Sequence, residues 1–138
     1  MRRFASLLGL ALLAACNTDI DQSTRPDNIA GTYHLATLAG ASLPARTMID
    51  TTAFQVVSGE LVMTAGGMWT ETLALTTVSP TGVTRSSTSS GGGSWVILRH
   101  QAYIAFTDRI NAYSFSGVGS GSMIVLRTTG GQEMVYRR

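Results

Sequence analysis

The sequence predicts an all-β domain, either a sandwich or a barrel, with closure into a small barrel favoured. Between residues 29 and 138, short segments rich in Thr, Val, Ile, Leu and aromatic residues are separated by clusters of Gly, Pro or Asp. Such turn signals at roughly 8–12-residue spacing are typical of antiparallel sheets. Apolar and polar residues alternate within the segments, and no stretch has the spacing of a long amphipathic helix. Closure is favoured because it removes unpaired sheet edges.

The expected strands follow one another between these turn signals. In the first half of the domain they are Gly31–Leu38, Ala53–Val57, Gly59–Thr64 and Met68–Val78, the last two forming a hairpin around Ala65–Gly67. The second half supplies Val83–Ser90, as a strand or a loop, then Ser94–Arg99, Ala102–Thr107, Ala112–Ser116, Ser122–Arg127 and Gln132–Arg137. Two Gly-rich segments are expected outside strands: Ser89–Ser94 as a mobile loop or a plain connection, and Gly117–Gly121 as a flexible hairpin end.

Alternation assigns the two faces of most strands. Trp69, Leu73 and Leu75 share one face and are expected to point inward. Glu71 falls on the same apolar face. Similar inward pairs are Tyr33 and Leu35, Leu61 and Met63, Ile104 and Phe106, Tyr113 and Phe115, and Ile124 and Leu126. The run Trp95–Leu98 is apolar on both faces, so its orientation stays open.

The N-terminus predicts a lipoprotein signal. Residues 1–15 have a charged start with Arg2 and Arg3 and an apolar run too short to span a bilayer, which needs about 20 residues. The order Leu13-Ala14-Ala15-Cys16 resembles the bacterial lipobox, in which the cysteine thiol receives a diacylglyceryl group and becomes the acylated first residue. The alternative is an ordinary secretory signal with an incidental cysteine.

Lipidation at Cys16 would anchor the chain stably in a membrane of the bacterial cell envelope. The resemblance implies three acyl chains, and two or more are enough for stable anchoring. Asn17 follows the cysteine where the inner-membrane retention signal of enteric bacteria has aspartate, which favours the outer membrane. Residues 16–28 are polar and acidic and are expected to form a flexible tether to the barrel domain, residues 29–138.

Charge excludes several classes of function. All ten basic residues are arginines, so lysine-dependent phosphate loops and Schiff-base or lysine-base chemistry are excluded. Without the two arginines of the signal, eight arginines balance eight acidic residues. A neutral mature chain offers no electrostatic footprint for nucleic acid.

A resemblance to a known family rests on short motifs. Gly31-Thr32-Tyr33 resembles the Gly-x-Trp opening of lipocalins, with tyrosine in place of tryptophan, and Gly93-Ser94-Trp95 repeats the pattern. With Gly66-Gly67-Met68-Trp69 and the closing Val135–Arg138, the domain is similar to the lipocalin-like domains of bacterial lipoproteins of unknown function. This resemblance implies an up-and-down antiparallel barrel of about eight to ten strands, either filled by side chains or holding one small ligand.

Catalytic and metal-binding patterns are missing from the sequence. The single cysteine is assigned to the lipid, and His34 and His100 are isolated from other ligand-type residues. His34 is expected to face solvent on its strand, and His100 to lie at a turn. No nucleophile elbow is present, and no helix follows the Gly-rich segments to bind a phosphate. We therefore predict a protein that is not an enzyme and carries neither metal nor cofactor.

Glu71 is the one polar residue on a face expected to be apolar. Its carboxyl must be neutral, paired with an arginine such as Arg99 or Arg127, or placed at a wet rim near the Gly66–Gly67 turn, which is the favoured position. The candidate pocket-lining residues are Tyr33, Met63, Trp69, Glu71, Trp95, Phe106 and Phe115, although core filling is the favoured role of the aromatic residues.

Two functional hypotheses follow for a monomeric envelope lipoprotein. In the first, the barrel binds a small apolar molecule in a cavity lined by these residues. In the second, the barrel is filled and the protein binds or inhibits an envelope protein through its loops. An enzyme would require Glu71 and one of the two histidines to meet in a cleft.

Overall fold

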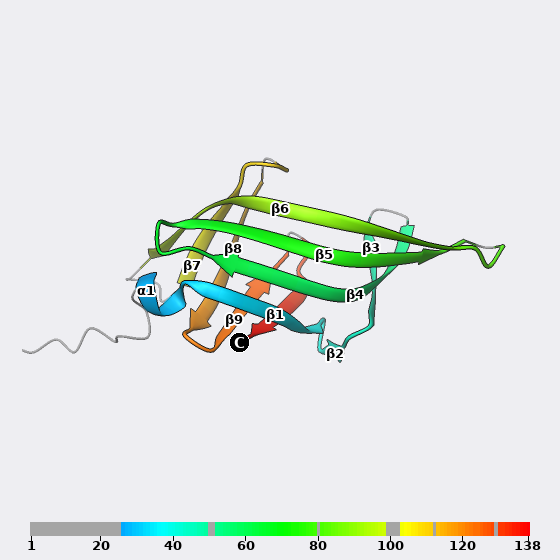
Figure 1. Ribbon diagram of the computed structural model, residues 1–138, viewed down its shortest axis with the longest axis horizontal. Coiled ribbons are helices and arrows are strands. Elements are labelled where there is room, and N and C mark those ends of the chain that lie inside the picture. The colour runs from blue at the N-terminus through cyan, green and yellow to red at the C-terminus, as the bar shows by residue number, and fades with distance from the viewer. Residues whose placement is uncertain (1–25, 50–51, 80, 99–102, 112, 129) are drawn as a thin grey trace, which may run out of the picture.

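The protein is an all-β barrel in the computed structural model, which describes residues 26–49, 52–79, 81–98, 103–111, 113–128 and 130–138 (Figure 1). Cys16, the signal segment, most of the predicted tether and His100 lie outside these residues. The elements are α1 (Pro26–Ile29), β1 (Gly31–Leu38), β2 (Ala41–Ser42), β3 (Ala45–Ile49), β4 (Thr52–Met63), β5 (Met68–Val78), β6 (Thr84–Leu98), β7 (Tyr103–Asp108), β8 (Tyr113–Ser120), β9 (Met123–Arg127) and β10 (Glu133–Arg137).

Eight antiparallel strands close the barrel in up-and-down order. The strands from β4 to β10 pair with their sequence neighbours, and β10 pairs with β1. The pairing of β1 with β4, from Gly31 opposite Met63 to His34 opposite Glu60, then closes the ring. The predicted barrel and its expected range of strand number are confirmed.

Two strands lie outside this ring and were not predicted. β2 pairs with the end of β1, and β3 pairs with the first half of β4. Between them the Leu43–Pro44 peptide bond is cis. The Thr47 hydroxyl donates to Gln132 Oε1 at 2.8 Å, which connects β3 to the turn between β9 and β10. Ala45 is buried in the main core, so β3 contributes to the core although it lies outside the ring.

Two predicted strand boundaries are wrong because single long strands replace pairs of short ones. Ala53–Val57 and Gly59–Thr64 belong to one strand, β4, with a register shift between Val56 and Ser58 where it pairs with β5. Val83–Ser90 and Ser94–Arg99 are joined within β6. A bulge lets a strand bend without ending, so a short interruption of the apolar and polar alternation does not by itself indicate a turn.

The prediction for the two Gly-rich segments is also wrong. Ser89–Ser94 lies in the middle of β6, paired throughout with β5. Gly117 and Gly119 lie in β8, and only Gly121 is in the turn that follows. At Gly93, a Cβ atom would lie 1.9 Å from the Thr107 carbonyl oxygen, so glycine permits a close approach of β6 and β7 rather than flexibility.

The core follows the predicted alternation. Trp69 and Leu75 are buried and Leu73 packs against the same cluster, as do the inward pairs of β1, β4, β7 and β9. Trp95 is 3% exposed and Val96 is 55% exposed, which resolves the orientation of the run from 95 to 98. His34 is exposed on β1, as predicted.

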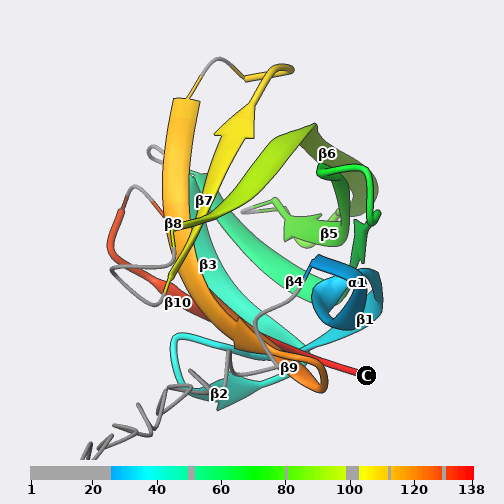
Figure 2. The same cartoon turned by 90° about the vertical axis from the view of Figure 1, so that its left-hand side faces the viewer.

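The single helical turn α1 lies at one end of the barrel (Figure 2). It includes Pro26–Asn28, which were assigned to the flexible tether. The Tyr33 hydroxyl donates to the Ile29 carbonyl at 2.6 Å, and the Arg138 guanidinium donates to the Ala30 carbonyl and lies 4.8 Å from the centre of the Tyr33 ring. These contacts fix the start of the domain against its C-terminus.

Candidate functional site

The predicted pocket-lining residues come together inside the barrel. Five of them are at most 3% exposed: Tyr33, Met63, Trp69, Trp95 and Phe106. Phe115 is partly buried against this core, and Glu71 is half-buried. These residues, chosen from the sequence, therefore lie together in the structure as one cluster.

Three aromatic rings of the cluster contact one another directly. Trp69 makes edge-to-face contacts with Phe106 and Phe115, with ring centroids 5.7 and 5.3 Å apart. Phe106 and Phe115 are stacked at 4.9 Å with an interplanar angle of 2°. The centroid distances and the interplanar angles of all three pairs are those that aromatic side chains favour. These rings fill their part of the interior with each other.

The polar atoms of the buried tryptophans are bonded to the backbone. Trp69 Nε1 donates to the Thr107 carbonyl at 3.3 Å, and Trp95 Nε1 donates to the Met68 carbonyl at 3.1 Å. The absence of a side chain at Gly91 makes room for the indole of Trp69, since a Cβ there would lie 3.2 Å from it. The indole donors are thus already used within the protein.

Glu71 is half-buried on the inner face of β5, and its hydrogen-bond partner is a tyrosine rather than an arginine. Its Cα is in register with Leu61, which is fully buried, and with Gly91. The Tyr136 hydroxyl donates to Glu71 Oε1. Burial raises the pKa of the Glu71 carboxyl; the hydrogen bond from Tyr136 lowers it and the Asp108 charge raises it further, so the net pKa is above its ordinary value. The proposed partner Arg127 instead lies 3.9 Å from Glu133, and Arg99 is outside the described residues.

Asp108 is a buried carboxylate that sequence reasoning missed. It is 1% exposed at the end of β7. Its Oδ1 accepts the backbone N–H groups of Ile110 at 2.8 Å and Asn111 at 2.9 Å, and its Oδ2 accepts from Asn111 Nδ2 at 2.9 Å. Burial pushes the pKa of Asp108 up, but these hydrogen bonds outweigh burial and hold it below its ordinary value. The signal that could have identified it is the sequence Asp108–Asn111, because Asp and Asn side chains often bond to the backbone of a turn.

The turn held by Asp108 contacts a second feature, the edge of β6 that faces away from β5. β5 pairs with β6 from Thr84 to Ser94, whereas β7 pairs with it only from Gly93 to Leu98. Among the described residues, no strand pairs with Thr84–Gly92 on the side away from β5. Residues Thr84–Thr88 are exposed, and this part of β6 forms an arm with β5 that extends away from α1 (Figure 1).

Two backbone hydrogen bonds, one near each end of the pairing between β5 and β6, show which groups point outward along this edge. Ser79 N–H donates to the Val83 carbonyl at 2.9 Å, and Trp95 N–H donates to the Gly67 carbonyl at 2.8 Å. Since hydrogen-bonded pairs alternate in an antiparallel ladder, the odd-numbered residues of β6 bond to β5. The even-numbered residues therefore direct their N–H and C=O groups away from β5: Thr84, Ser86, Thr88, Ser90 and Gly92.

One end of this edge is closed by the turn after β7. Arg109 N–H donates to the Gly92 carbonyl at 2.8 Å, and Asn111 Nδ2 lies 3.5 Å from the Ser90 carbonyl. The remaining stretch, from Thr84 to Thr88, is the free edge. Exposed edges are normally protected by charge, proline or a bulge. Arg85 is the one charged residue of this stretch, and no proline interrupts it.

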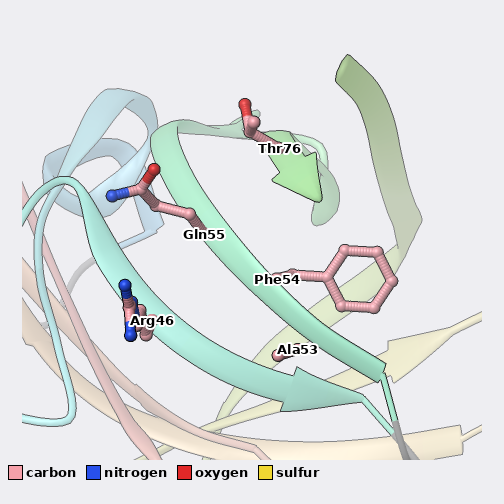
Figure 3. A pocket seen from close by; sticks show the side chains of 5 residues that line it. All are labelled: Arg46, Ala53, Phe54, Gln55 and Thr76. Carbon is pink, nitrogen blue, oxygen red and sulfur yellow. The ribbon is translucent and has the colours of Figure 1, made fainter. Parts of the chain in front are cut away.

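A shallow groove lies next to this arm on the outer face of the sheet (Figure 3). It has a volume of about 240 Å³ and is lined by Arg46, Ala53, Phe54, Gln55 and Thr76. The phenyl ring of Phe54 points away from Gln55, so the polar side chains form the outer wall. Arg46, Gln55, Thr76 and Ser86 are successive partners across β3 to β6, which places the groove in line with the free edge. None of the predicted pocket residues lines it.

Among the residues with described positions, no group of three potential metal ligands occurs. Within the same residues, no helix is both long and apolar enough to cross a bilayer. Comparison with protein-family models, with curated proteins and with solved structures gave no match.

Proposed function

We propose that this protein is a lipid-anchored lipoprotein of the bacterial cell envelope that binds a protein partner, without catalysis, by accepting a strand on the free edge of β6. The supporting observation is the row of outward backbone groups at Thr84, Ser86 and Thr88. Addition of a strand to an exposed edge is a common mode of peptide recognition, in which main-chain hydrogen bonds supply affinity.

The packing of the interior supports this function over binding of a small apolar ligand. Of the aromatic residues that would line a ligand cavity, Trp69, Phe106 and Phe115 contact one another, and all except the partly buried Phe115 are buried. An apolar ligand would have to displace them, with loss of their packing. Ligand binding in the barrel stays a prediction, and native mass spectrometry of the domain would detect the adduct it requires.

Charge near the free edge favours an acidic partner segment. Arg85 lies on the edge, Arg109 flanks its closed end, and Arg46 lies in the adjoining groove. Antiparallel pairing of two copies of the free edge about Ser86 would place the two Arg85 side chains on one face at diagonal cross-strand positions. Like charges at neighbouring cross-strand positions are unfavourable, so a different protein with acidic residues fits better than a second copy.

The experiment places a photoreactive side chain at Thr84 in the full chain and irradiates intact cells. We expect an adduct that disappears with Thr88→Pro, because proline removes an outward N–H group but no bond to β5. The matched control is a photoreactive side chain at Ser116, which is exposed on β8 away from this edge. An adduct that survives Thr88→Pro, or forms equally from position 116, would contradict strand addition.

Anchoring is tested separately from strand addition. Cys16→Ser should release the protein from membranes and stop incorporation of labelled fatty acid. Fractionation of the two membranes then tests the outer-membrane address that Asn17 favours. Incorporation of fatty acid into the Cys16→Ser protein would contradict the lipid assignment without affecting the free edge.

A further inference from the structure

The outer surface of the barrel is divided into a polar and an apolar part. On β5 and the first half of β6, the outward residues are mostly Thr and Ser, as at Thr72 and Thr88. From the end of β6 to β10, the outward residues include a row of apolar side chains, which lies next to a more polar row with Ser116 and Arg127. We define this apolar outer face by Val96, Leu98, Tyr103, Val118, Val125 and Val135.

These residues form a continuous stripe across five strands. Leu98 pairs with Tyr103, Val118 pairs with Val125, and Val125 pairs with Val135. The pairing of the inward residues Ile104 and Gly117 sets Tyr103 beside Val118. Neighbouring strands lie about 4.8 Å apart, so the side chains of the stripe adjoin one another.

Half of the stripe is well exposed and the rest is half-buried, although the fold does not require these residues to be apolar. Val96 is 55% exposed, Val118 is 50% exposed and Leu98 is 38% exposed. The opposite faces of the same strands already supply the core through Trp95, Ile104 and other residues. Antiparallel strands with one wet face normally carry polar residues there. A contiguous apolar stripe instead marks a surface that another apolar phase covers.

The start of the folded chain lies beside this stripe. A Cβ at Gly121, three residues after Val118, would lie 3.2 Å from the Asn28 carbonyl oxygen of α1. Residues 17–25 separate Cys16 from Pro26. At about 3.3–3.6 Å per residue, this segment reaches no more than about 36 Å. A lipid at Cys16 would therefore hold this end of the barrel near the bilayer.

The residues around the stripe suit a lipid surface. Tyr103 has an apolar ring with a polar hydroxyl, a combination favoured at membrane interfaces. Arg137 is exposed two residues from Val135 on the same face of β10, where it can meet anionic headgroups. A stable dimer would need about 800 Å² per partner, and three well-exposed aliphatic side chains are too few to supply it.

We propose that the apolar outer face rests on the surface of the membrane that holds the lipid anchor, and so directs the β5–β6 arm away from the bilayer. This inference rests on the anchoring part of the proposed function. It assigns a role to the run from 95 to 98, which is apolar on both faces: Trp95 and Ile97 pack in the barrel, and Val96 and Leu98 face the lipid.

The test uses the lipidated full chain in vesicles of phosphatidylethanolamine and phosphatidylglycerol, with a nitroxide on the lipid headgroups. A fluorophore is attached to an introduced cysteine, either Ser116→Cys beside Val118 or, as a matched exposed control, Thr72→Cys on the polar face of β5. We expect strong quenching at position 116 and little at position 72. The double variant Val96→Ser/Val118→Ser should lower the ratio of docked to undocked protein about tenfold.

Flotation of the vesicles separates failure of this inference from failure of anchoring. Protein that floats but is quenched equally at positions 116 and 72, or equally with and without the double substitution, would overturn the membrane-facing surface and leave the anchor intact. Protein that does not float would instead contradict the anchor. Energy transfer between labelled copies at position 116, independent of the nitroxide, would show a dimer face and also overturn the inference.

Discussion

Phe106→Ala is the substitution that separates a filled barrel from a ligand cavity most clearly. Phe106 is 1% exposed and contacts two other rings, Trp69 at 5.7 Å and Phe115 at 4.9 Å. Removal of a buried phenyl ring costs about 3–5 kcal/mol where the surroundings cannot collapse. Each aromatic pair adds about 0.5–1.5 kcal/mol beyond burial. We expect a loss near the upper end, about 4–5 kcal/mol, out of a total stability of about 5–15 kcal/mol for a domain of this kind.

The assay is urea unfolding of the mature chain followed by tryptophan fluorescence and circular dichroism. The midpoint should fall strongly with little change in the dependence of free energy on urea. Phe106→Leu, which keeps most of the volume, should cost less than about half as much. Val118→Ala, at an exposed position, should stay within about 0.5 kcal/mol of the wild type. A cost below about 1 kcal/mol for Phe106→Ala would show that this ring lines open space, and would refute the filled interior.

Three further substitutions test the interior. Gly93→Ala should destabilise the protein by about 2–3 kcal/mol in urea unfolding, because the new Cβ would lie 1.9 Å from the Thr107 carbonyl; a neutral effect would contradict the close approach. Glu71→Gln should raise the free energy of unfolding near neutral pH and have little effect in acid, since a raised folded pKa costs stability once the pH exceeds the unfolded value; a pH-independent difference would contradict this. Asp108→Asn should cost about 2–3 kcal/mol near neutral pH. Because the folded pKa of Asp108 is lowered, the stability it contributes is present above the unfolded pKa and lost as pH falls through the folded one, so this cost should shrink in acid.

A matched glycine control accompanies Gly93→Ala. Gly40 has φ of +79° and no atom within 4 Å of a new Cβ, so Gly40→Ala carries only the cost of a left-handed backbone, about 1–2 kcal/mol. If both substitutions cost the same, steric contact between β6 and β7 is not the reason for glycine at position 93.

The barrel was predictable because strand alternation is local. The period of two on β5 placed Trp69 and Leu75 inward without knowledge of any partner strand. The same parity placed Glu71 inside. Its partner, Tyr136, is 65 residues away, and that pairing depends on how the ring of strands closes. The sequence left open a neutral carboxyl, an arginine partner or a wet rim, and favoured the rim. In the structure a tyrosine hydroxyl bonds to this carboxyl, whose pKa is raised by burial.

The Gly-rich part of β6 shows where local reasoning failed. Glycine marks either a flexible loop or a close approach, and the sequence around Gly91–Gly93 is the same in both cases. The deciding contacts are with Trp69 from β5 and the backbone of β7. The free edge was missed for a related reason. It depends on β6 being one strand that is much longer than β7, and the turn signals had divided β6 into two short predicted segments.

Amide hydrogen exchange along β6 of the isolated protein tests most directly whether its edge is free to receive a partner strand. We expect the amides of Ser87 and Ser89, which bond to β5, to be protected from exchange. The amides of Ser86 and Thr88 should exchange at rates close to those of an unstructured chain. Equal protection of all four amides would mean that this edge is already covered, and would contradict strand addition as the mode of binding.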